Sequence, residues 1–112
     1  MSKVDKVRRL LGQCFYIGFE GVEVPKDVSK FIVDNHIGGV TLFANNYESP
    51  AQVAELTNSL QALSSKQKDN DVPMTIAVDH EGGKVQRFKK PFTKFPPAAV
   101  IGLDPGLRTG CK

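Results

Sequence analysis

Residues Met74–Gly83 read MTIAVDHEGG, and this stretch decides the fold. Its first five residues form an apolar run with Pro73 just before it, where a missing backbone donor is tolerated, and this indicates a buried strand. Two carboxylates and two glycines follow the run directly. Polar residues at the end of a buried strand are typical of parallel α/β sheets, which bind ligands at the carboxyl ends of their strands.

Upstream of this strand, the apolar residues alternate between the spacing of helices and short strand-like runs. Steps of three and four residues predict amphipathic helices in residues 4–14, 28–32 and 53–63. Short β-rich runs at 15–19 and 40–43 separate these segments. Apolar strands that alternate with amphipathic helices indicate βαβ units and a parallel sheet.

Ser49, Pro50 and Gln52 mark the start of the third helix. The serine can accept from the first backbone N–H groups, the proline suits the first turn, and the glutamine would complete a capping box. We expect a polar loop over residues 64–70, and a long loop rich in Phe, Pro and Lys beyond Gly82. Three parallel strands leave two open edges, so the chain is interpreted as the opening part of a larger α/β domain.

Length and composition limit the classes of protein. The 112 residues fit one domain at most, and the 40% hydrophobic share is too high for a disordered chain. No apolar run reaches the roughly 18 residues of a membrane span, and the basic start lacks the pattern of a secretory signal. Cys14 and Cys111 lie far apart in the sequence, so we interpret both as free thiols and predict a cytoplasmic protein.

A short basic segment contributes most of the net charge of +3. Five cationic side chains alternate there with phenylalanines: Lys84, Arg87, Lys89, Lys90 and Lys94. Basic residues among aromatic ones are found on nucleic-acid surfaces. We favour the alternative of a solvated loop that phenylalanines anchor to a core, with neither nucleic acid nor membrane as a partner.

Asp79 is the strongest candidate for a ligand contact. It follows the strand directly, so its carboxylate would lie at the carboxyl edge of the sheet and accept from two hydroxyls of a polyol. Gly82 and Gly83 would permit a sharp turn, and Arg87 would hold a second ligand oxygen. The alternative makes Asp79 a cap and the glycines ordinary turn residues. Asn45–Tyr47 would add amide donors and an aromatic edge to the same face.

Other chemistry lacks a suitable arrangement of residues. Asp79 and Glu81 would project from one side of a sugar, whereas the two carboxyl groups of a glycosidase flank the scissile bond. His36 and His80 are too few and too scattered for a metal site. Cys14 falls on the apolar face of its helix, and no serine nucleophile motif or nucleotide-binding loop occurs. We therefore predict no metal and no cofactor.

Two longer segments resemble a known family. Ile37–Phe43 followed by Asn45–Tyr47 is similar to the second-strand signature of glycoside hydrolase family 3. Ile76–Phe88 followed by Phe92–Pro96 is similar to its third-strand motif, in the β-N-acetylhexosaminidase (NagZ-like) branch. The similarity runs from about residue 7 to residue 102. Two positions depart from the usual motif, with histidine in place of glutamine at 80 and lysine in place of arginine at 84.

The resemblance implies the fold and an activity. Residues 1–103 would be the N-terminal portion, about three βα units, of a (β/α)8 TIM barrel, and 104–112 a loose tail. The family cleaves terminal β-linked N-acetylglucosamine with retention, including sugars released in peptidoglycan recycling. Asp79 matches a residue that binds hydroxyls of the sugar in the first subsite, and Arg87 matches a second substrate contact.

The same resemblance implies that the catalytic groups lie elsewhere. The family's KHFPGHG motif, its catalytic histidine loop and its nucleophilic aspartate all lie downstream of the matched motifs, and none occurs in these 112 residues. We therefore expect no catalytic residue here and no turnover from this chain alone. The alternative function is a non-catalytic carbohydrate-binding or scaffold protein that self-associates through its open sheet edges.

Overall fold

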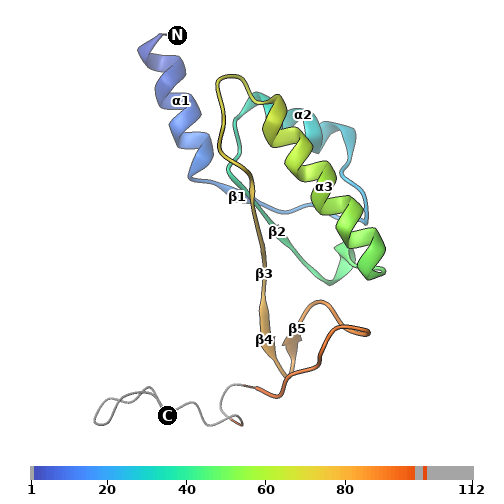
Figure 1. Ribbon diagram of the computed structural model, residues 1–112. Coiled ribbons are helices and arrows are strands. Elements are labelled where there is room, and N and C mark those ends of the chain that lie inside the picture. The colour runs from blue at the N-terminus through green and yellow to red at the C-terminus, as the bar shows by residue number, and fades with distance from the viewer. Residues whose placement is uncertain (1, 98–99, 101–112) are drawn as a thin grey trace, which may run out of the picture.

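The computed structural model describes residues 2–97 and 100, and its centre is a parallel sheet. The strands follow the order β1-β2-β3, in which Ile17 pairs with Val40 and Val40 with Ile76. Helices α2 and α3 form the crossovers and lie side by side on one face of the sheet (Figure 1). The bounds are α1 Lys3–Gln13, β1 Tyr16–Ile17, α2 Lys26–Asp34, β2 Gly39–Leu42, α3 Pro50–Lys66 and β3 Thr75–Val78.

The core lies between the sheet and these two helices. Val40 and Leu42 of β2 are fully or almost fully buried against Ile32 of α2 and Leu60 of α3. The remaining buried apolar side chains belong to Ile37, Leu56, Leu63 and Met74. The predicted helical spacing of residues 53–63 is thereby confirmed, because its apolar positions face the sheet.

Helix α3 begins at the predicted residue, but its capping box and its last turn differ from the prediction. Ser49 caps it as predicted, since its Oγ accepts from the backbone N–H of Gln52 at 3.1 Å. The Gln52 side chain accepts from the backbone N–H of Glu48 instead of completing the box with Ser49. The helix also continues to Lys66, so the polar loop predicted from residue 64 begins later. Ser64 is buried there and donates to the carbonyl of Val72 at 2.8 Å, which packs the last turn against the chain entering β3.

Helix α1 is confirmed, but its apolar stripe lies exposed. Val4, Val7, Leu10 and Leu11 have between 48% and 61% of their surface accessible. Arg9 in the middle of the helix donates to the carbonyl of Asp69, and the end of the helix meets the start of β2. Cys14, the exposed cap of α1, is a free thiol. Strand β1 is also shorter than the predicted run of residues 15–19. The periodicity of α1 predicted a helix and left open what it packs against.

The end of α1 meets the start of β2 through glycines. The backbone N–H of Gly38 donates to the carbonyl of Gly12 at 3.0 Å, and Gln13 Nε2 donates to the carbonyl of His36 at 2.6 Å. A Cβ atom on Gly12 would overlap the carbonyl oxygen of Asn35, and one on Gly38 would overlap the backbone of Gln13. Two backbones therefore touch here without intervening side chains.

Replacing Gly12 by alanine is expected to lower the free energy of unfolding by about 2 kcal/mol, because the backbones must move apart. Urea denaturation followed by circular dichroism measures this loss. Gly18→Ala is the matched control, since its Cβ would lie 3.5 Å from the ring of Phe43, in ordinary van der Waals contact. An equal effect of both variants would contradict the close approach at Gly12.

A small antiparallel hairpin follows β3, where the sequence predicted only a loop. Strand β4 (His80–Gly82) pairs with β5 (Val85–Gln86). Gly82 ends β4 and Gly83 begins the turn, with φ angles of +79° and +57°. Glycine is favoured in this conformation, so the predicted sharp turn is confirmed. The hairpin escaped prediction because strands of two or three residues carry no periodic pattern.

Two further features concern the extent of the described chain. No helix within it has the length and apolarity that a membrane crossing demands. The predicted domain end at residue 103, the tail 104–112 and Cys111 all lie outside the described residues.

Candidate functional site

Asp79 and Arg87 come together at the carboxyl end of β3. Asp79 directly follows the strand, and its Oδ2 lies 3.9 Å from Nη2 of Arg87. The side chain of Asp79 is 55% exposed and that of Arg87 is 32% exposed. An ion pair of this length and exposure contributes little stability. It leaves the carboxylate oxygens accessible to hydroxyl donors, and no hydrogen bond within the described residues caps a segment with Asp79.

Arg87 also joins the ends of two neighbouring strands. Its guanidinium carbon lies 5.7 Å from the centre of the Phe43 ring, and Phe43 directly follows β2. A cation over an aromatic face is attracted by the negative charge of that face. The guanidinium therefore lies between the ends of β2 and β3, where ligands bind in parallel α/β folds.

Asn46 is not the ligand contact that the sequence predicted. It ends a short 3-10 helix, η1 (Ala44–Asn46), and is fully buried. Its Oδ1 accepts from the backbone N–H of Phe43 at 2.8 Å, and its Nδ2 donates to the carbonyls of Phe19 at 3.0 Å and Gly21 at 2.8 Å. These bonds tie the segment after β1 to the segment after β2. The amide is used inside the protein, and no donor remains for a ligand.

An aromatic cluster holds the loop after β5 against η1. The ring of Tyr47 stacks on Phe88 with centres 5.1 Å apart, and Phe92 lies 5.7 Å from Tyr47 and 5.8 Å from Phe88. The Tyr47 hydroxyl donates to the carbonyl of Lys90 at 2.6 Å. Phe88 also packs on the core. This confirms for Phe88 the interpretation that phenylalanines anchor the basic loop, whereas Phe95 is half exposed.

The buried side chain of Gln86 holds the backbone of the same loop through hydrogen bonds. This role was not predicted from the sequence. The side chain is buried, and its Nε2 donates to the carbonyls of Phe88 at 3.3 Å and Thr93 at 2.9 Å. Its Oε1 accepts from the backbone N–H of Phe95 at 3.0 Å. These bonds span nine residues of loop and fix the backbone on either side of Arg87. A glutamine with no apolar pattern around it gives no signal of this role.

The two histidines lie apart, as predicted. His36 Nε2 lies 2.9 Å from the carbonyl of Lys68, near the amino ends of the strands. His80 is exposed beside the Phe95 ring. Within residues 2–97, no three His, Cys, Asp or Glu side chains gather in a way that could hold a metal ion.

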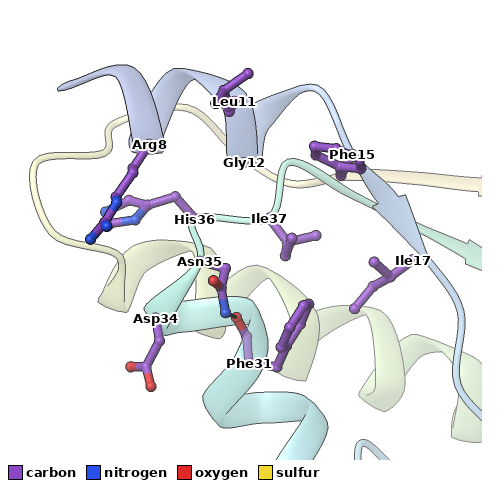
Figure 2. Close-up of a pocket in the computed structure, with 10 residues that line it drawn as sticks. All are labelled: Arg8, Leu11, Gly12, Phe15, Ile17, Phe31, Asp34, Asn35, His36 and Ile37. Atoms are coloured by element: carbon purple, nitrogen blue, oxygen red, sulfur yellow. Dashed lines mark hydrogen bonds between the residues drawn. The ribbon is translucent and has the colours of Figure 1, made fainter. Parts of the chain in front are cut away.

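The hollow in Figure 2 is a different feature, at the opposite end of the sheet. It has a volume of about 450 Å³ and lies between α1, β1 and α2, with Leu11, Phe15, Ile17 and Phe31 among its lining residues. Apolar side chains predominate in it, and it adjoins the unpaired edge of β1. Asp79 and Arg87 do not line it, so it is not the site that the sequence predicted.

Comparison with known proteins places this arrangement in a family. Residues 5–107 match the glycosyl hydrolase family 3 N-terminal domain. The chain belongs to glycoside hydrolase family 3. Its three parallel strands and the helices that connect them are the first part of the family's (β/α)8 barrel, and the predicted fold class is confirmed.

Relatives and solved structures agree with this assignment. A β-hexosaminidase from Nitrosomonas eutropha is 56% identical over 66 residues, which cover 59% of this chain and 17% of the relative. A family 3 β-N-acetylglucosaminidase from Paenibacillus sp. str. FPU-7 superposes with a TM-score of 0.78 at 37% identity, over 87% of this chain and 18% of that one. NagZ from Neisseria gonorrhoeae, in complex with N-trifluoroacetyl-D-glucosamine, superposes with a TM-score of 0.68 at 33% identity. That match covers 78% of this chain and 24% of the NagZ chain.

The chain is much shorter than these family 3 relatives. It spans between 17% and 25% of the length of the curated β-hexosaminidases compared. The family assignment therefore describes residues 5–107, which match the N-terminal domain, and the activity of a whole family 3 enzyme is treated as a proposal.

Proposed function

We propose that this chain supplies an N-terminal, sugar-binding part of a family 3 glycosidase that hydrolyses terminal β-linked N-acetylglucosamine with retention. The observation that carries the proposal is the position of Asp79, exposed at the carboxyl end of β3 and facing Arg87. The names of the relatives support the substrate class, because they are β-hexosaminidases and a β-N-acetylglucosaminidase. The cytoplasmic location expected from the sequence stays a prediction.

The proposed contact follows from the chemistry of a carboxylate. Asp79 accepts hydrogen bonds from two neighbouring hydroxyls of the sugar, which an ionised carboxylate does more strongly than an amide. Arg87 orients the carboxylate across 3.9 Å and donates to a further sugar oxygen. Asn46 holds the segment after β2 in place and makes no contact with the sugar.

The bond-breaking groups are proposed to lie outside these 112 residues. Retention requires a nucleophile and an acid/base on either side of the glycosidic bond, which are two carboxyl groups about 5 Å apart in most retaining enzymes. The resemblance implies an aspartate nucleophile and a histidine loop for these two roles, both downstream of the matched motifs. Asp79 belongs to the binding part of this proposal, and Glu81 extends from the same hairpin. We therefore expect the chain by itself to bind the sugar weakly and to leave the glycosidic bond intact.

Saturation-transfer NMR with methyl β-N-acetylglucosaminide tests the binding part. The 112-residue chain should give a transfer signal that Asp79→Asn abolishes and Asp71→Asn, an exposed control before β3, retains. A chromogenic β-N-acetylglucosaminide should remain unhydrolysed by all three proteins. Hydrolysis that Asp79→Ala removes, or a transfer signal that Asp79→Asn leaves unchanged, would contradict the proposal.

A second candidate function is a self-associating sugar-binding scaffold. The observation in its favour is that β1 and β3 each pair on one side only within the described sheet. Parallel edges of this kind are templates for pairing with another chain. Sedimentation equilibrium distinguishes the two functions, since a discrete oligomer that binds N-acetylglucosamine favours the scaffold and a monomer favours the glycosidase part.

A further inference from the structure

Four lysines line one hollow, one from the turn of the hairpin and three from the loop after it. Lys84, Lys89, Lys90 and Lys94 are all exposed, and they surround a volume of about 550 Å³ together with Gly83, Gln86 and Phe92. We call this feature the lysine hollow. Its volume falls in the range of small-molecule sites, roughly 300 to 1,000 Å³. Among the described residues no carboxylate lines it, and neither Asp79 nor Arg87 belongs to it.

The four lysines of the hollow carry more positive charge than the net charge of the whole protein. The chain has 15 basic and 12 acidic side chains, so the four lysines exceed the net charge of +3. Without them, 11 basic side chains would face 12 acidic ones. Within the described residues, the two ion pairs involve Lys30 and Arg87, and none involves a lysine of the hollow. In this part of the chain no acid pairs with these lysines, so an anion bound in the hollow would be attracted by all four charges.

The loop that presents these lysines has a fixed backbone. Gln86 bonds three of its backbone groups, and the Tyr47 hydroxyl bonds the carbonyl of Lys90. The N–H of Phe92 donates to the carbonyl of Lys89 at 2.9 Å, and that of Gly83 to the carbonyl of Phe95 at 2.8 Å. A charged surface that is held in place before binding costs less to order when a ligand arrives.

The surroundings favour a small ligand over nucleic acid. Single strands stack successive bases on several exposed aromatic rings. Phe88 packs on the core and stacks on Tyr47, and Phe92, 39% exposed, is the one aromatic residue among the described lining residues. The four lysines also line one open hollow of small-molecule size. Lysine ammonium groups act as compact point charges towards oxyanions. We propose that the lysine hollow binds a small ligand that carries two or more phosphate or carboxylate groups.

NMR titration of the 15N-labelled chain with inorganic tripolyphosphate, and separately with citrate, tests this inference. We expect saturable shifts at the amides of Gly83, Gln86 and Phe92. The double variant Lys89→Gln/Lys90→Gln should weaken binding about tenfold, because two of the four charges are lost. The control Lys26→Gln/Lys66→Gln removes two exposed lysines elsewhere and should leave the affinity unchanged. The tighter of the two ligands identifies phosphate or carboxylate as the preferred group.

Three results would overturn the inference. Equal weakening by both double variants would indicate non-specific charge attraction, as would equal affinity for sulfate. Tighter binding of a dT oligonucleotide than of tripolyphosphate would indicate a nucleic-acid surface. Should the first double variant fail to fold, Lys84→Gln/Lys94→Gln replaces it with the same expectation. Asp79→Asn should bind tripolyphosphate normally, so failure of this inference and failure of the proposed sugar site give different results.

Discussion

Asp79→Asn is expected to lower kcat/KM about 100-fold in a chimera of this chain with the Nitrosomonas eutropha β-hexosaminidase. In this chimera, residues 5–97 replace the corresponding part of that enzyme's family 3 N-terminal domain. The carboxylate is proposed to accept two sugar hydroxyls, and a hydrogen bond to a charged group contributes about 1.5 to 3 kcal/mol. Losing about 3 kcal/mol of binding corresponds to roughly 100-fold. Steady-state hydrolysis of a chromogenic β-N-acetylglucosaminide measures the change.

The controls for this experiment separate binding from folding. Asparagine keeps the shape of the side chain and removes its charge, so the substitution tests the ionised carboxylate itself. Asp71→Asn in the same chimera makes the same substitution at an exposed aspartate before β3 and should keep full activity. A chimera with the Asp79→Asn substitution that retains kcat/KM within about threefold of its parent would remove Asp79 from the proposed site.

Asn46→Leu is expected to destabilise the chain by about 3 kcal/mol. Three partners would lose the hydrogen bond that Asn46 supplies: the N–H of Phe43 and the carbonyls of Phe19 and Gly21. A buried polar group left without a partner costs about 1 to 3 kcal/mol, and leucine of similar size offers no replacement. Urea denaturation of the 112-residue chain measures the loss.

The neighbouring asparagine provides the control for this prediction. Asn45 is exposed, so Asn45→Leu should change the free energy of unfolding by about 0.5 kcal/mol or less. Two results would contradict the structural role of the Asn46 hydrogen bonds. One is an equal loss of stability in both variants, and the other is an Asn46→Leu variant that unfolds at the same urea concentration as the parent. The pair therefore tests burial alone, because the two positions share one residue type and one short helix.

The same two asparagines show where prediction from sequence stops. Both follow a predicted strand and both are common turn residues, so local pattern gave them the same interpretation. The structure separates them because Asn46 points to carbonyls 25 and 27 residues earlier in the chain. Gln86 behaves similarly, since nothing in its neighbours marks it as buried. Such roles depend on which distant segments pack together, and a single sequence carries no record of that.

Local pattern determined the parallel α/β class, the three main helices and the place of Asp79 after β3, because backbone periodicity and strand ends are set by neighbouring residues. The family motifs added the barrel to which these units belong. Only the tertiary structure decided that Arg87 faces Asp79, that the Asn46 amide bonds within the protein, and that four lysines surround one hollow. The first and third of these depend on the hairpin and its loop, which pack against the ends of β2 and β3. The second depends on the segment after β1, which packs against the segment after β2. Both kinds of packing join residues far apart in the sequence.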